Sequence, residues 1–166
     1  STADTTTEEK AVLDAEKKNS EAQDSLTSAE SAYTPVKSAY DAALSALQSA
    51  QSVYDEAKTD YEAAEKAYKA DASKKDARDA AELAMNKAQA KVNTAQSTFN
   101  TCQANLNKVQ GSYDSAKSAA TDSKNALSNA NYNLSVKKLT GTNTAEANNL
   151  QAQLNTATAA LTDANT

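Results

Sequence analysis

Apolar side chains along this chain follow a seven-residue repeat, not the two-residue alternation of a β-strand. Between residues 22 and 68, large and small side chains alternate at steps of three and four residues without a miss. The large positions, termed a, are Leu26, Tyr33, Tyr40, Leu47, Tyr54, Tyr61 and Tyr68; the small positions, termed d, are Ala22, Ala29, Val36, Ala43, Ala50, Ala57 and Ala64. Such a repeat gathers both sets on one helix face and is typical of a coiled coil. It predicts a helix over about residues 7–70.

The same rule resumes after a short polar interruption. Its a positions are Met85, Val92, Phe99, Leu106, Tyr113, Ala120, Leu127 and Leu134, and its d positions are Ala88, Ala95, Cys102, Val109, Ala116, Ser123 and Ala130. A third, shorter run consists of Ala147, Leu150, Leu154, Ala157, Leu161 and Ala164. These runs predict a second helix over about 76–138 and a third over about 144–165, with turns at about 71–75 and 139–143.

Capping residues agree with these boundaries. Before each predicted helix, a side-chain oxygen is followed about three residues later by an acid, which suits the positive end of the helix. The three sets are Thr5 or Thr6 with Glu8 or Glu9, Ser73 with Asp76, and Asn143 with Glu146.

The first two helices have nearly equal lengths, roughly 95 Å each at 1.5 Å per residue. A connection of a few residues between equal helices predicts an antiparallel hairpin, in which opposed residues have numbers summing to about 142–149. This register brings Tyr33 near Tyr113, Tyr40 near Leu106 and Leu47 near Phe99. We expect the third helix to fold back on the end that holds both termini. The predicted fold is all-α: one elongated domain over 1–166, an alanine-rich hairpin with a three-helix bundle at that end.

Pro35 is the single proline and lies inside the first repeat. The repeat keeps its phase from Tyr33 to Val36, which favours a kinked but continuous helix. The alternative is a break, with Thr34 as N-cap and Pro35 at the first position of a new helix. The register places Gly111 opposite Pro35, where it would let the second helix bend at the same level.

Composition narrows the class of protein. Two glycines and one proline are too few for the turns of a sheet protein, and 37 of the 166 residues are Ala, so the core is thin. A net charge of −5 argues against a nucleic-acid partner. Without His and with one Cys, the chain cannot supply the usual ligand set of a zinc or haem site. The acidic loop over 70–76 carries two lysines, which disfavours calcium. We expect no metal, no cofactor and no enzymatic activity, and no stretch suggests membrane insertion.

Two features of the sequence are candidates for contact with another molecule: a row of tyrosines and the single cysteine. The tyrosine stripe, defined as Tyr33, Tyr40, Tyr54, Tyr61 and Tyr68, could stack glycan or peptide like an aromatic ladder, although its spacing of seven favours packing in the helix seam. Cys102 occupies a d position, which favours a small buried apolar role. An intermolecular disulfide is the alternative for this cysteine.

The repeated spacing in the segment from Tyr54 through Tyr61 to Tyr68 resembles the alanine-rich helical regions of Gram-positive bacterial surface proteins, including adhesins. Long helical hairpins of protozoan surface coats are similar in outline. The resemblance implies an extended stalk, spacer or adhesive module outside the cell. The chain begins at Ser1 without Met, which fits an exported protein whose signal peptide has been removed, or a piece of a longer protein.

From these features we expect a noncatalytic rod, extracellular or at the cell surface, with a protein or glycan partner. The alternative is an exchangeable lipid-binding bundle of amphipathic helices. Self-association also stays open, because the two-helix tip of the predicted hairpin is incompletely covered.

Overall fold

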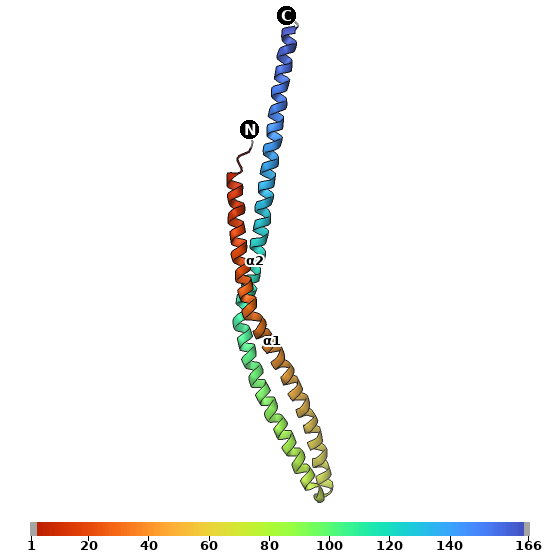
Figure 1. Ribbon diagram of the computed structural model, residues 1–166. Helices are drawn as coiled ribbons and strands as arrows, with labels where there is room; N and C mark the ends of the chain where they lie inside the picture. The colour runs from red at the N-terminus through yellow and green to blue at the C-terminus, as the bar shows by residue number, and fades with distance from the viewer. Residues whose placement is uncertain (1–2, 165–166) are drawn as a thin grey trace. The chain divides into compact units, whose positions relative to one another are not determined.

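The computed structural model describes residues 3–164, nearly all of which are helical. Helix α1 spans Thr6–Ala70, a short 3-10 helix η1 spans Ala72–Lys74, and α2 spans Lys75–Ala164 (Figure 1). The described residues include no β-strand. The all-α prediction is confirmed, and the ends of α1 and the start of α2 lie within a residue of the predicted positions.

The predicted turn at 139–143 is wrong, because α2 continues through it as one helix of 90 residues. Gly141 has no positive φ and so does not end the helix as a left-handed cap. The hydroxyls of Thr142 and Thr144 donate to the carbonyls of Lys138 and Thr140, four residues earlier, at 3.1 and 2.9 Å. These polar side chains are thus satisfied within the helix. Asn143 lies inside α2 and caps nothing.

Gly141 is present for close approach rather than for a turn. A Cβ built on it would lie 2.4 Å from the Cβ of Ala3 and 2.7 Å from the backbone nitrogen of Ala3. Only a residue without a side chain lets the segment before α1 rest against α2 here. The residue that suggested a helix end is therefore a packing residue.

The heptad assignment is confirmed by burial. Every a and d position from Ala22 to Tyr68, and from Met85 to Leu134, is buried or half-buried, whereas most positions between them are exposed. The most buried apolar side chains are small, as the thin core predicted: Val12, Ala43, Ala88, Val92 and Ala120. Ala88 and Ala120 retain only 4% and 3% of their surface. Methyl groups therefore form the centre of the seam.

The chain divides into two compact units. One comprises Ser28–Asp114, and the other comprises the chain up to Thr27 together with the part from Ser115 onward. In the unit of Ser28–Asp114, α1 and α2 lie side by side and are joined at the turn, so the chain runs in opposite directions along them (Figure 1). Contacts join Glu65 to Arg78 near the turn and Tyr33 to Tyr113 far from it. In these contacts the residue numbers rise along α2 as they fall along α1, which is the pattern of an antiparallel pair of helices.

The second unit is built the same way from the start of α1 and the later part of α2. The hydroxyl of Ser123 donates to the Asn19 side-chain oxygen at 3.3 Å. Farther along, the Lys137 ammonium lies 4.0 Å from a carboxylate oxygen of Glu8. These pairs also have numbers summing to 142 and 145, within the predicted register.

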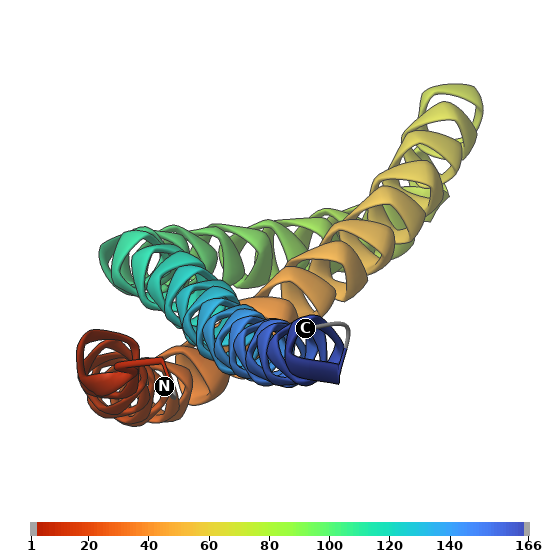
Figure 2. The ribbon, with the colours of Figure 1, turned by 90° about the horizontal axis from the view of Figure 1, so that it is seen from above.

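The predicted third helix does not form, and neither does the three-helix bundle at the termini. Its predicted last residue, 165, lies outside the described part of the chain. From Glu146 to Ala164 every residue of α2 is exposed. Figure 1 shows this part of α2 continuing past the start of α1 without another helix beside it, and in the view from above its dark blue end lies apart from the red start of α1 (Figure 2). Leu150, Leu154 and Leu161 therefore face solvent.

Pro35 lies inside α1, which continues on both sides of it. The break with Thr34 as N-cap is therefore not observed, and the continuous helix is confirmed. A Cβ on Gly111 would have nothing within 4 Å. Gly111 is thus not required by a close approach of α1.

Candidate ligand-binding surface

The tyrosine stripe lies on the edge of the helix seam in the unit of Ser28–Asp114. All five of its side chains, Tyr33, Tyr40, Tyr54, Tyr61 and Tyr68, are half-buried. Their spacing of seven keeps them on one face of α1 beside the alanines at d. Each ring thus covers part of the seam and leaves the rest of its surface in water, as an amphipathic side chain does at a thin interface.

Two rings of the stripe contact aromatic rings of α2. Tyr33 stacks on Tyr113 with ring centroids 4.4 Å apart and planes 10° apart, which confirms the predicted neighbours. Tyr40 contacts Phe99 at 5.2 Å with planes tilted by 42°. The register had paired Phe99 with Leu47 instead, because it compared backbone levels and not the direction in which a long side chain leans along its helix.

A third ring is covered by a cation at the turn. The guanidinium carbon of Arg78 lies 4.8 Å from the ring centroid of Tyr68, and its nitrogens reach Glu65 at 3.5 Å and Asp79 at 2.8 Å. Arg78 is the single arginine of the chain. Its planar guanidinium can stack and bridge carboxylates at the same time. Sequence reasoning missed this residue, although a lone arginine among sixteen lysines was a signal.

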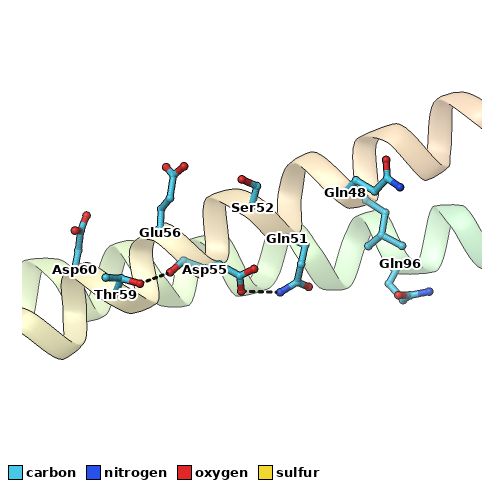
Figure 3. Close-up of a pocket in the computed structure, with 9 residues that line it drawn as sticks. Gln48, Gln51, Ser52, Asp55, Glu56, Thr59, Asp60 and Gln96 are labelled. Atoms are coloured by element: carbon cyan, nitrogen blue, oxygen red, sulfur yellow. Dashed lines mark hydrogen bonds between the residues drawn. The ribbon is translucent and has the colours of Figure 1, made fainter.

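An open groove of about 880 Å³, lined mainly by residues of α1, lies within the same unit. Its lining residues are Leu47, Gln48, Gln51, Ser52, Asp55, Glu56, Thr59, Asp60 and Gln96. Figure 3 shows Ser52, Glu56 and Asp60 pointing outward from α1. The Asp55 carboxylate accepts a hydrogen bond from the Gln51 amide at 3.0 Å, and its backbone carbonyl accepts one from the Thr59 hydroxyl at 3.0 Å. The lining contains none of the five tyrosines.

The polar groups of this groove are those of a solvated helix face. Gln51 and Asp55 pair four residues apart on α1, as on many exposed helices. Of the lining residues, only Leu47 is half-buried. The polar side chains of the groove are therefore open to water.

Asp71, in the loop considered for calcium, has a structural role. Its carboxylate caps η1 by accepting a hydrogen bond from the backbone N–H of Ser73 at 3.0 Å. The hydroxyl and the backbone N–H of Ser73 hold the pKa of this carboxyl below its usual value. The predicted Ser73 cap is thus replaced by a cap from Asp71. Across residues 3–164, no three side chains of the types that bind metals gather at one point.

Cys102 is half-buried at its d position and is not part of an intramolecular disulfide. Nor does either helix, over its described length, include a segment long and apolar enough to cross a bilayer. Comparison with family models, curated proteins and solved structures found no match for this chain.

Proposed function

We propose that this chain is a noncatalytic helical rod, extracellular or at the cell surface, that acts as a stalk, spacer or adhesive module. In this proposal α1 and α2 form an elongated, antiparallel, alanine-rich coiled coil. The exposed polar faces of the rod present a binding surface to a protein or glycan partner. The observation that carries the proposal is the unbroken series of buried or half-buried a and d positions from Ala22 to Tyr68 and from Met85 to Leu134.

Such a seam builds length without a deep interior. A straight helix of the 90 residues of α2 would be about 135 Å long at 1.5 Å per residue. The core consists largely of methyl groups at positions such as Ala43 and Ala88. A protein that works by reach needs stiffness along one axis and has no need of an enclosed cavity. The seam meets that requirement at small cost in apolar surface.

The contacts of the tyrosine stripe favour a role in packing over a role in ligand binding. The rings of Tyr33 and Tyr40 contact α2, and that of Tyr68 lies under Arg78. A glycan that stacked on these rings would have to displace contacts within the protein. The partner would then bind the outward polar faces, of which the groove beside Asp55 is one example.

The cell-surface location is supported by the resemblance of the segment from Tyr54 to Tyr68 to alanine-rich surface proteins. Protease treatment of intact source cells tests it, followed by detection with an antibody against the chain. Loss of the signal without lysis supports the location. Full protection until lysis contradicts it.

Small-angle scattering of the monomer tests the rod. A compact chain of this length would have a radius of gyration of about 15 Å, whereas a rod as long as α2 would exceed it at least twofold. Circular dichroism on the same sample excludes an unfolded chain, which would also be expanded. A helical protein with the compact value would contradict the proposal.

One observation favours the alternative, an exchangeable lipid-binding bundle. The leucines at 139, 150, 154 and 161 are each at least 60% exposed, and leucines of this kind insert into lipid when the helix also carries basic residues. Flotation with neutral and with anionic vesicles separates the two functions. Binding to neutral vesicles at physiological salt would favour the lipid function over the rod.

A further inference from the structure

The last part of α2 carries an apolar stripe, interrupted only at Asn143, that no other element of residues 3–164 covers. We define this C-terminal stripe by its six large, exposed side chains: Tyr132, Val136, Leu139, Leu150, Leu154 and Leu161. Each retains between 43% and 69% of its surface. Ala147, Ala157 and Ala164 continue the stripe at intervals of three and four residues and are also exposed.

The C-terminal stripe lies on the opposite side of α2 from the intramolecular seam. Tyr132 follows the seam residue Ala130 by two positions, and Val136 follows Leu134 in the same way. Two residues correspond to about 200° around an α-helix. Since Ala130 and Leu134 are half-buried and the residues two positions later are exposed, the two faces of α2 are distinct. A helix laid on the C-terminal stripe would not displace α1.

We infer that the C-terminal stripe pairs, parallel and in register, with the same stripe of a second copy of this chain. Its repeat of three and four residues is that of a coiled-coil seam, for which the fitting occupant is another helix. In register, each large side chain meets its own copy, and the alanines meet in layers between them. Antiparallel pairing of residues 140–164 would leave Tyr132 and Val136 uncovered.

The charges beside the stripe favour a copy over a different partner. From Leu139 to Thr162 the chain carries a single charge, that of Glu146. In a parallel pair, Glu146 lies across from Gln151 of the second copy, so no like charges oppose each other. Flanking charges normally select a particular partner in coiled coils, and here they are missing. The absence of Lys and Arg from the same range also disfavours a lipid surface.

Asn143 supports the parallel register. It lies on the stripe between Leu139 and Ala147 and is exposed. An asparagine in an otherwise apolar seam is satisfied when it faces another asparagine, which occurs here only in register. A single seam asparagine fixes alignment and the two-stranded state at some cost in stability.

The size of the interface predicts a weak dimer. The stripe of 33 residues, from Tyr132 to Ala164, is about 50 Å long at 1.5 Å per residue, and a helix contact about 10 Å wide would cover on the order of 500 Å² on each chain. Stable complexes cover about 800 Å² per partner. We therefore expect reversible dimerisation that depends on concentration.

Sedimentation equilibrium of the full chain, from micromolar to near-millimolar, tests the pairing. The variant with Leu150→Lys and Leu154→Lys places two cations against two cations and should remain monomeric while staying helical. The matched control carries Leu13→Lys and Leu83→Lys, which lie outside the stripe and are 64% and 54% exposed. The control should dimerise like the parent. A parent that stays monomeric throughout, or a stripe variant that dimerises equally well, would overturn the proposal.

The alignment has its own test. Chains with Leu154→Lys and chains with Leu154→Glu should each associate poorly, whereas their equimolar mixture should regain the dimer, because position 154 meets 154. Failure of the mixture to associate would overturn the parallel register. Vesicle flotation of the same samples tests whether the stripe binds lipid and not a second copy of the chain. Loss of the dimer on adding neutral vesicles, with binding that depends on Leu150 and Leu154, would assign the stripe to lipid instead.

Discussion

Changing each of the two glycines of α2 to alanine should affect the stability of the protein differently. Neither has a positive φ, so neither is needed for its conformational freedom. Inside a helix, glycine is less favourable than alanine by about 0.8–1.0 kcal/mol. A Cβ on Gly111 would have nothing within 4 Å, and the residue is exposed. Gly111→Ala should therefore stabilise the protein by nearly the full propensity difference.

Gly141→Ala gains the same helix propensity, but its new Cβ also collides with Ala3. In Gly141→Ala the new Cβ would lie 2.4 Å from the Cβ of Ala3 and 2.7 Å from its backbone nitrogen. Ala3 precedes α1 and can be displaced without unwinding either helix. We expect this variant to fall below Gly111→Ala in stability, with the contact at Ala3 lost.

Thermal unfolding followed by circular dichroism at matched low concentration measures both effects. For a chain of this size, about 1 kcal/mol shifts Tm by roughly 2–4 °C. Gly111→Ala should raise Tm by that amount, and NMR shifts of the Ala3 methyl should change in Gly141→Ala alone. A fall in Tm for Gly111→Ala would refute the reasoning, since it would show that α2 needs a glycine to bend opposite Pro35.

Three further predictions concern the seam and the turn. A double-mutant cycle with Tyr33→Ala and Tyr113→Ala should give a coupling of about 0.5–1.5 kcal/mol by urea unfolding, as measured for stacked aromatic pairs; additive losses would mean that the rings do not interact in solution. Ala88→Leu, at a position only 4% exposed, should cost about 1–3 kcal/mol by overpacking, while the exposed control Ala84→Leu should stay within about 0.5 kcal/mol of the parent; equal effects would contradict an alanine seam. Because the pKa of Asp71 is lowered in the folded state, its contribution is present above the ordinary value of 3.8 and is lost as the pH falls through the folded value. Asp71→Asn should flatten this part of the acid unfolding profile, and an unchanged profile would exclude the cap as its source.

The seam was predictable because residues spaced three and four apart lie on the same face of an α-helix. The spacing of Tyr33, Val36 and Tyr40 alone placed them on one side of α1, and their burial agrees. Pro35 did not mislead the assignment, because the phase of the repeat survived it. The interaction of Arg78 with Tyr68 and Glu65 was not predictable in the same way. It depends on side chains from two helices meeting across a turn.

Predictions from local sequence were wrong where the structure depends on a contact between residues distant along the chain. The run from Thr140 to Asn143 has the composition of a turn, but the hydroxyls of Thr142 and Thr144 bond back within the helix. Gly141 is explained by Ala3, which is far away along the chain. No pattern within ten residues could reveal that contact. The same error produced the predicted third helix, since a leucine run with no visible partner was assumed to fold back.

The sequence by itself determined that the chain is helical and which faces of α1 and of α2 up to Leu134 are buried, because these follow from the periodicity of apolar side chains. Only the tertiary structure decided which residues end a helix and which faces stay uncovered, because those outcomes depend on contacts between residues distant along the chain. Gly141 against Ala3 and the open stripe around Leu154 are the two places where that difference matters most.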